Sequence, residues 1–214
     1  AVEFERIAAY IRATAQAKKG NYMVFFPSYK MMRQVYEVFL ACGGEELTCS
    51  EDGRKPEQES LSEEERGGIA CIIQRSGMRE AEREAFLEVF SGEASAEREA
   101  SLVAFCVLGG IFGEGIDLKN EQLIGAIIVG TGLPQVGNER EILMNYYDAR
   151  SGSGFDYAYR YPGMNKVLQA AGRVIRTASD VGVIELLDER FLQSDYRGLF
   201  PREWEQRTVC NIGT

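Results

Sequence analysis

The chain has 214 residues, a formal net charge of −9 and no histidine. The missing histidine excludes Ser-His-Asp triads, Cys-His dyads and most zinc hydrolases. The excess of acid argues against broad nonspecific nucleic-acid binding, which needs clustered lysine and arginine. The charge is uneven, however, because residues 160–176 contain four cations and no acid, so a local nucleic-acid contact stays open.

The five cysteines are an odd number, and no two of them form a CxxC pair. This spacing excludes a disulfide framework and a zinc knuckle, so we expect no metal site in this chain. Cys71 and Cys106 lie in apolar runs, where a buried, inert thiol is typical. No stretch approaches the ~20 apolar residues that span a bilayer. We expect a soluble, intracellular and cytoplasmic protein without a membrane partner, nucleoid-associated if it is bacterial.

Short apolar runs, typical of buried parallel strands, alternate along the chain with helical patterns. In chain order, the predicted elements are a helix at 3–18, a strand at 22–26, a helix from Pro27-Ser28 to Gly43-Gly44, a strand at 69–74, a helix at 79–90, strands at 101–110 and 123–134, helices at 139–150 and 163–176, and a strand at 181–188. Residues 151–154 (SGSG) are predicted to form a flexible turn.

Alternating strands and long helices indicate βαβ units. The sequence therefore predicts a three-layer α/β/α fold with a mainly parallel sheet. Residues 50–68 are highly polar, lack apolar periodicity and are predicted to be a mobile acidic insert. No internal repeat and no second domain is evident, so residues 1–214 are read as one domain.

Nucleotide-binding fingerprints are missing from the chain. No stretch matches GxxxxGK[ST], and the glycine clusters all miss the GxGxxG spacing. The sequence therefore disfavours a Rossmann dinucleotide site and a self-sufficient ATPase. Ligands of parallel sheets sit at the carboxyl ends of the strands, which directs attention to residues 27–29, 74–76, 109–117 and 130–134.

The stretch QAAGRVIRT (169–177) contains two arginines in a predicted helix. Gln169, Gly172, Arg173 and Arg176 share one helical face, because steps of three and four return to the same side. Like charges at this spacing repel, and an interior glycine costs about 1 kcal/mol against alanine. An anionic ligand would explain this arrangement. The alternative is a surface helix whose arginines pair with acids elsewhere.

Two motifs in order suggest a family. FGEGID (112–117) after a strand and QAAGRVIRT before the last strand resemble motifs V and VI of superfamily 2 helicases, specifically the XPD/DinG-like DNA helicases. Other segments resemble the family in the same order, namely VFFPSY (24–29, like motif IV), IIQ (72–74), IIVGTGLP (127–134), LDERF (187–191), Tyr196-Arg197-Gly198 and Phe200-Pro201. The resemblance covers nearly the whole chain except the insert at 50–68.

The resemblance implies a RecA-like fold and the second of two RecA-like domains. ATP and Mg²⁺ would be held mostly by the absent first domain, which in many members also carries an iron–sulfur cluster; none is expected in this chain. The expected partners are that first domain and single-stranded DNA. The implied activity is ATP hydrolysis by a 5′→3′ DNA helicase, with a setting such as DNA repair, and the isolated chain should be inactive.

The resemblance also assigns roles near the nucleotide. Arg173 and Arg176 would be catalytic and reach the γ-phosphate, at least one of them as an arginine finger, since cations there supply 10³–10⁵ in rate. Gln169 would sense the nucleotide, and Gly172, which has no side chain, would let the opposite domain approach this face of the helix. Further ATP-side residues at the domain interface would be Glu114, Gly115 and Asp117, for which an ordinary βα turn with capping acids is the alternative.

Candidate DNA-binding residues follow two other predicted strands. Ser28 is a plausible helix N-cap, and free N–H groups at such a start bind phosphate. By resemblance, Ser28 and Tyr29 would contact the DNA backbone, and Gln74 is a candidate of the same kind. The tyrosines around Arg160 allow either base stacking or aromatic packing at a domain edge.

Two other functions stay open at this point. A non-catalytic nucleotide- or protein-binding module of RecA-like fold would use the same cleft without chemistry. A related motor could act on RNA instead of DNA. A GKT-type P-loop upstream in the parent gene would separate the motor from the module.

Overall fold

The computed structural model describes residues 2–47, 68–112, 122–175 and 180–211. The acidic insert predicted at 50–68 lies outside these ranges except for Gly68. So do four candidate site residues, namely Glu114, Gly115, Asp117 and Arg176. Among the described residues, no helix is both long and apolar enough to cross a membrane.

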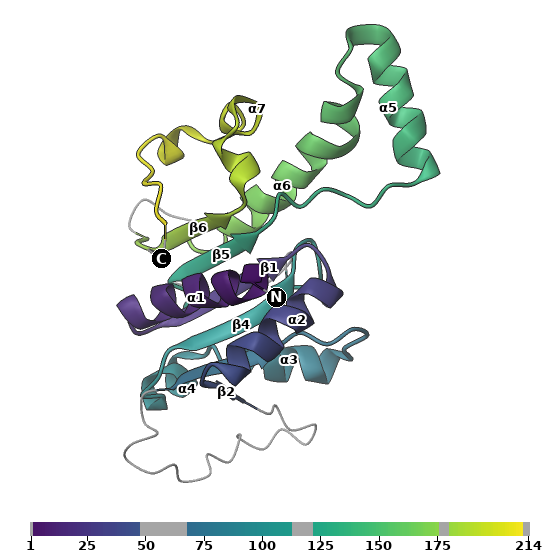
Figure 1. The fold of residues 1–214 in the computed structure, drawn as a ribbon. Helices are drawn as coiled ribbons and strands as arrows, with labels where there is room; N and C mark the ends of the chain where they lie inside the picture. Colours follow the sequence, from purple (N-terminus) through teal and green to yellow (C-terminus); the bar gives the residue numbers. More distant parts are fainter. Residues whose placement is uncertain (1, 48–67, 113–121, 176–179, 212–214) are drawn as a thin grey trace.

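Six parallel strands form one sheet in the order β2-β3-β4-β1-β5-β6 (Figure 1). In chain order the strands are β1 (Asn21–Phe26), β2 (Gly44–Glu46), β3 (Ile69–Ile73), β4 (Leu102–Val107), β5 (Gly125–Val129) and β6 (Val183–Leu187). The mainly parallel α/β sheet expected from the sequence is confirmed.

Among the strands of the described residues, β2 is the one that the sequence does not predict. It has three residues, Gly-Glu-Glu, none of which is fully buried, and it pairs with β3 at the edge of the sheet. Apolar periodicity cannot reveal such a strand, because its stability comes from the backbone ladder with its neighbour.

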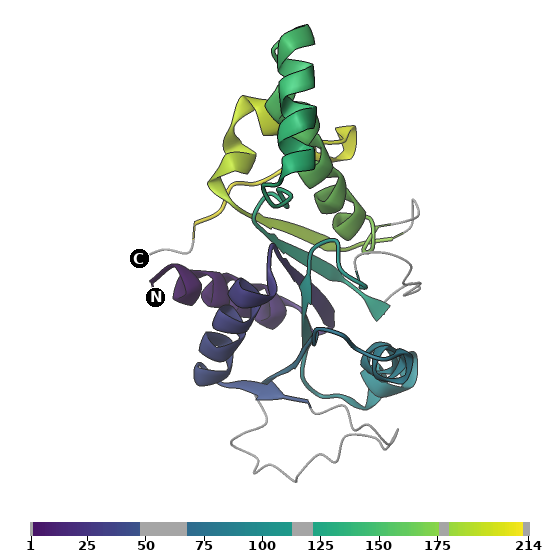
Figure 2. The same ribbon diagram turned by 90° about the vertical axis from the view of Figure 1, so that its right-hand side faces the viewer.

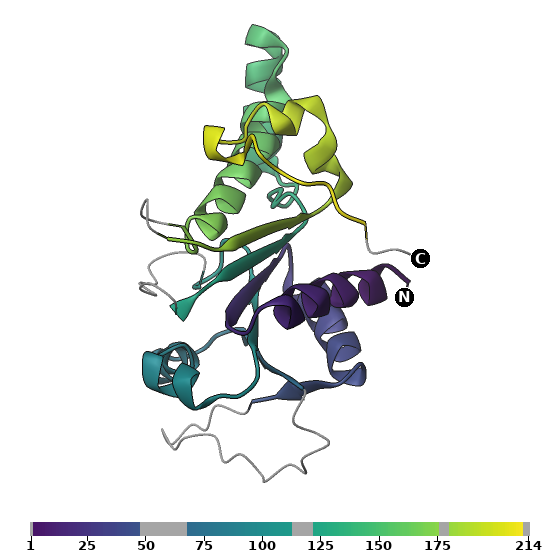
Figure 3. The same ribbon diagram turned by 90° about the vertical axis from the view of Figure 1, so that its left-hand side faces the viewer.

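Helices cover both faces of the sheet, which confirms the three-layer fold. One face packs against α1 (Val2–Ala17) and α2 (Tyr29–Ala41), and the other against α3 (Glu80–Glu88) and α6 (Tyr161–Ala171). Figures 2 and 3 show α1 and α2 on one side of the sheet and α3 on the other. Every residue of β1 is buried, because both faces of a central parallel strand are covered.

A helical arm projects from the sheet between β5 and β6 (Figure 1). It consists of α5 (Asn138–Ser151), which has no buried residue, and a π-helical turn (Asp156–Arg160) that runs directly into α6. The predicted helix at 139–150 is confirmed. Gly152 ends α5 in the left-handed conformation, with a φ of 68°.

Short elements complete the chain. Helix α4 (Gly92–Glu97) precedes β4, and after β6 come a 3-10 turn (Glu189–Leu192), α7 (Ser194–Arg197) and a second 3-10 turn (Arg202–Trp204). Phe191 and Tyr196 of this C-terminal segment are buried in the same apolar cluster as α3 and α6. The segment therefore belongs to the core of the domain.

Candidate functional site

Helix α6 ends at Ala171, so the predicted helix 163–176 is wrong at its C-terminal end. Gly172 is the C-cap, and the next two N–H groups bond three residues back: Arg173 N to Ala170 O (3.2 Å) and Val174 N to Ala171 O (3.1 Å). Such i→i+3 bonds tighten a helix end into a 3-10 turn. Gly172 is therefore not an interior residue, and the helical cost expected for it does not apply.

Packing explains why the helix stops here. Val174 is 5% exposed, and its Cγ1 lies so close to Gly182 that no Cβ would fit on that glycine without a shift. The chain leaves the helix so that Val174 can pack beside the start of β6. Tertiary packing of this kind overrides the helical preference of the sequence.

The turn still leaves two predicted site residues on the surface. Gln169 and Gly172 are exposed, and Arg173 is half-buried. A Cβ on Gly172 would meet only backbone oxygens of its own helix, Leu168 O at 3.3 Å and Gln169 O at 3.7 Å. Gln169, Gly172 and Arg173 are called here the arginine turn; no side chain of the described residues covers Gly172, and the turn is exposed at its first two residues.

The arginine turn lies at the amino ends of the strands. Helix α6 begins near the carboxyl end of β5, since Gly163 packs against the backbone of Thr131 and Gly132. It ends near the amino end of β5, where Val183 N donates to Ile124 O (2.9 Å). The candidate residues are thus divided between two edges of the sheet.

At the carboxyl edge, Ser28 is the N-cap of α2, as the sequence predicts. Its φ of −157° is extended, and its Oγ accepts a hydrogen bond from Met31 N (3.2 Å). The N–H groups of Tyr29 and Lys30 occupy the first two helical positions, which have no acceptor within the helix. These N–H groups and the positive end of the helix dipole can receive an anion.

Gln74 lies beside Tyr29 but is 1% exposed. Its Nε2 donates to Tyr29 Oη (2.9 Å), and its Oε1 accepts from Val107 N (2.9 Å). Both ends of the amide are therefore used inside the protein. The geometry makes Gln74 a support that fixes Tyr29 against β4.

Lys166 is a carboxyl-edge residue that the sequence reading did not single out. Its alkyl chain passes Gly109, which has a φ of +70°; a Cβ there would lie 3.0 Å from Lys166 Cδ. A Cβ on the next residue, Gly110, would lie 3.2 Å from Gln74 Nε2. The only sequence signal was the acid-free run at 160–176, which does not indicate which cation faces this edge.

The tyrosines of the arm pack mainly on one another. Tyr147 and Tyr157 stack with ring centroids 4.1 Å apart, and Tyr157 meets Tyr161 edge-on at 5.2 Å. Tyr159 is buried, whereas Tyr157 is 43% exposed. Aromatic packing at a domain edge, one of the two alternatives for this segment, is therefore observed.

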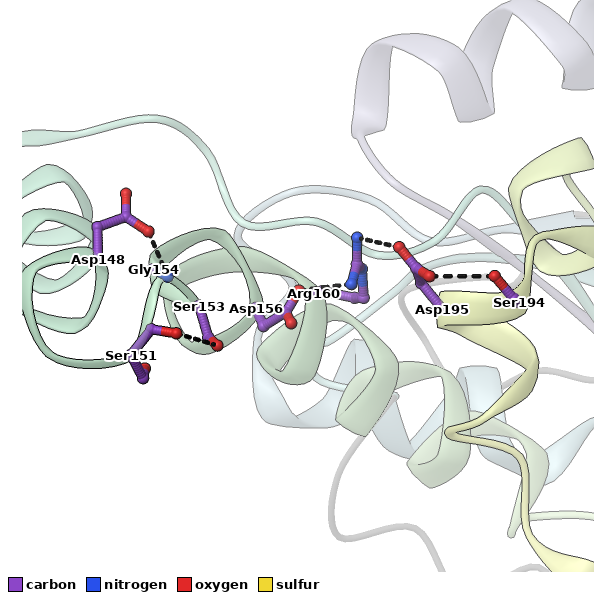
Figure 4. A network of polar contacts seen from close by, with 8 residues as sticks. All are labelled: Asp148, Ser151, Ser153, Gly154, Asp156, Arg160, Ser194 and Asp195. Atoms are coloured by element: carbon purple, nitrogen blue, oxygen red, sulfur yellow. Dashed lines mark hydrogen bonds and ion pairs between the residues drawn. The ribbon is translucent and has the colours of Figure 1, made fainter.

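Arg160 joins the arm to the C-terminal segment (Figure 4). Its guanidinium pairs with Asp156 at 2.5 Å and Asp195 at 3.1 Å, and it lies over the rings of Phe155 and Tyr196. Two carboxylates thus neutralise this cation. Arg160 thus connects the base of the arm to α7.

Two of the cysteines are buried, as expected. Burial raises the pKa of Cys71 to about 12 and raises that of Cys106 as well, so both thiols stay protonated. Among the described residues, no group of three or more His, Cys, Asp or Glu side chains is placed to hold a metal ion.

Comparison with known proteins identifies the family. The family model described as the helicase C-terminal domain matches residues 11–207. The chain belongs to this family. It is 30% identical over 188 residues to the regulator of telomere elongation helicase 1 of Bos taurus, and 25% identical over 218 residues to the ATP-dependent DNA helicase CHL1 of Coccidioides immitis (strain RS).

The chain spans only a small part of the length of these relatives. The alignments cover 84% and 94% of this chain but only 14% and 24% of the two relatives. Among solved structures, an XPD helicase aligns with a TM-score of 0.63 at 20% identity, over 91% of this chain and 29% of that one. The Xpd4 protein of S. tokodaii aligns with a TM-score of 0.55 at 16% identity, over 94% and 33%. The RecA-like architecture expected from the sequence is thereby matched in fold.

Proposed function

We propose that this helicase C-terminal domain, residues 1–214, is the second motor domain of an ATP-dependent DNA helicase. The observation that carries the proposal is the arginine turn. It offers Arg173 beside the exposed Gln169 and Gly172, in a chain that has no P-loop of its own. A cation presented without a phosphate loop suits ATP that is bound by another domain.

In this proposal, Arg173 acts on the γ-phosphate across a domain interface, together with Arg176. Phosphoryl transfer spreads negative charge over the phosphate oxygens, and a guanidinium can make two parallel hydrogen bonds to them. Gln169 contacts the nucleotide from the preceding turn, and Gly172 lets the opposite domain approach. Glu114, Gly115 and Asp117 complete the interface, while the first domain holds Mg²⁺ and most of the ATP contacts.

The carboxyl edge is proposed to hold single-stranded DNA by its backbone. Ser28 shapes the N-terminus of α2, whose first N–H groups can bond a phosphate oxygen whatever the base. Tyr29 lines the same place, held there by Gln74. Lys166 adds a positive charge next to Gly109. Such contacts are independent of sequence, as translocation requires, and we propose the 5′→3′ direction.

The test uses the full-length enzyme with single-stranded DNA. We expect ATP hydrolysis that DNA stimulates more than RNA does, and no ATPase from residues 1–214 alone. Equal stimulation by RNA would favour an RNA motor. A parent gene without a GKT-type P-loop upstream would overturn the assignment to a motor.

A further inference from the structure

Arg98 is a buried arginine that belongs to none of the helicase-like motifs. Arg98 is the C-cap of α4 and is 8% exposed. Its Nη1 donates to Asn21 Oδ1 (2.9 Å), and its Nη2 donates to Val89 O (2.6 Å). Among the described residues no carboxylate pairs with it, and burial lowers its pKa. A buried guanidinium is costly unless its hydrogen bonds are specific.

Asn21 connects Arg98 to the segment that precedes β5. Asn21 is 1% exposed, and its Nδ2 donates to Gln122 O (2.9 Å) and to Ser95 Oγ (3.3 Å). Its backbone O also accepts from Ile124 N (2.9 Å). Gln122 directly follows the segment 113–121, which carries candidate interface residues. One asparagine thus holds both ends of a three-residue stretch.

The same stretch supports the arginine turn. Ile124 O accepts from Val183 N (2.9 Å), and a Cβ on Gly182 would lie 2.8 Å from Ile124 O. The same Cβ position would also overlap Val174 Cγ1, so Val174, the residue after Arg173, packs where Gly182 has no side chain. A continuous set of contacts therefore runs from Arg98 to Arg173, with backbone atoms and a glycine at its tightest points.

We propose that Arg98 and Asn21 are positioning residues for ATP hydrolysis, because they fix the stretch 122–124, which packs with Gly182 and with Val174 next to Arg173. The inference depends on the proposed function, because it assigns Arg173 to the γ-phosphate. A hydrogen-bonded pair sets atom positions more narrowly than apolar packing does. Misplacement of a reacting group by 1 Å can cost about a hundredfold in rate.

The variant Asn21→Asp in the full-length enzyme separates position from stability. It keeps the acceptor for Arg98 and adds a charge pair, but it removes the donor to Gln122 O. We expect kcat for DNA-stimulated ATP hydrolysis to fall about tenfold to a hundredfold, with the KM for ATP changed less than about twofold. Loss of the donors to Gln122 O and Ser95 Oγ should lower the unfolding temperature by an amount comparable to Ser101→Ala, so Ser101→Ala serves as the stability control. A kcat within twofold of the parent would overturn the inference.

Matched variants keep the test interpretable. Ser101→Ala removes bonds at the same edge, to Ala15 O and from Gly20 N, without touching Gln122, so it should lower stability but spare kcat. If Ser101→Ala lowers kcat as much as Asn21→Asp, the role is structural and the inference fails. Should Asn21→Asp not fold, Arg98→Lys takes its place, with a smaller fall in kcat expected and an unchanged kcat contradicting the inference.

The parallel variant Arg173→Ala tells the two proposals apart. Turnover lost in Arg173→Ala but kept in Asn21→Asp overturns the positioning role alone. Turnover kept in Arg173→Ala overturns the proposed function itself.

Discussion

The two edges of the sheet hold their candidate residues in different ways. At the carboxyl edge, Ser28 is tied to Met31, and Tyr29 is bonded to the buried Gln74. At the amino edge, Arg173 stands in a turn past the end of α6, next to the exposed Gln169 and Gly172. The carboxyl edge holds its candidate residues through a cap and a buried hydrogen bond, whereas at the amino edge Arg173 follows the last residue of α6.

This difference has a physical consequence for mutations. A change at the carboxyl edge disturbs caps and buried hydrogen bonds, so it should alter stability as well as DNA affinity. A change in Arg173 removes a half-buried side chain just past the last helical residue, and we expect its main effect on turnover. The variants below test that contrast.

The largest effect is expected for Arg173→Ala in the full-length enzyme. Turnover should fall by 10² or more because a cation at the transferred phosphoryl group is lost, while ATP binding is largely kept. ATPase assays measure the turnover, and nucleotide titration measures the affinity for ATP. Arg173→Lys, which keeps the charge but not the planar fork, should fall between the parent and Arg173→Ala. Parent-like turnover in Arg173→Ala would contradict the proposal that the amino edge governs turnover.

For Gln74→Leu we expect a smaller effect, which lowers stability and DNA affinity and leaves turnover unchanged. The change leaves Val107 N–H buried without its acceptor, which costs about 1–3 kcal/mol of unfolding free energy. Tyr29 also loses its support, so the DNA concentration at half-maximal ATPase should rise. Because the arginine turn is untouched, kcat at saturating DNA should stay near the parent value; a matching loss of kcat would contradict this.

Ser28 offers a pair of variants that separate capping from phosphate contact. Ser28→Ala should lower stability by about 1 kcal/mol through loss of the N-cap. Ser28→Asp keeps a good cap but places a negative charge where phosphate is proposed to bind. We expect Ser28→Asp to be as stable as the parent and to bind single-stranded DNA about tenfold more weakly, one lost contact being worth about 1.4 kcal/mol. Unchanged DNA affinity would exclude the N-terminus of α2 from the DNA path.

The smallest effect is expected for Glu185, which lies on β6 midway between the carboxyl and amino edges. Burial raises the pKa of this carboxyl above 4.5, and the hydrogen bond from Thr14 Oγ1 (2.8 Å) opposes the rise in part. Because the folded pKa exceeds the unfolded one, stability is greatest below the unfolded pKa and falls as pH rises through the folded pKa.

Glu185→Gln should therefore be more stable than the parent at pH 7. The gain should vanish below pH 4.5, where the carboxyl is protonated in both states. Denaturant unfolding at the two pH values measures the difference. DNA affinity and turnover should stay unchanged, since Glu185 lies midway along β6, opposite Ile127 and away from both strand ends.

Local patterns made much of the fold predictable. Continuous apolar runs predict β1 and β4, since central parallel strands are buried on both faces. Ser28 before a helical pattern predicts the cap that the structure has. The three-residue β2 and the π-helical turn before α6 have no such pattern, because neighbouring segments decide them.

The site was less predictable because it depends on contacts between distant residues. Helix α6 stops early so that Val174 can pack by Gly182, and neither residue signals this in the sequence. Arg98 and Asn21 are 77 positions apart, so nothing in the sequence connects them. The roles of Arg173 and Ser28 came from motif resemblance and stay predictions that the variants above address.

Arg173 is proposed to meet the γ-phosphate of ATP that is bound by another domain. The most direct measurement is trapping of ADP with aluminium fluoride, a mimic of the transferring phosphoryl group, by the full-length enzyme and by Arg173→Ala. We expect the parent to retain the trapped nucleotide, and Arg173→Ala to release it while binding ADP alone with the parent affinity. Equal trapping by both proteins would contradict the claim.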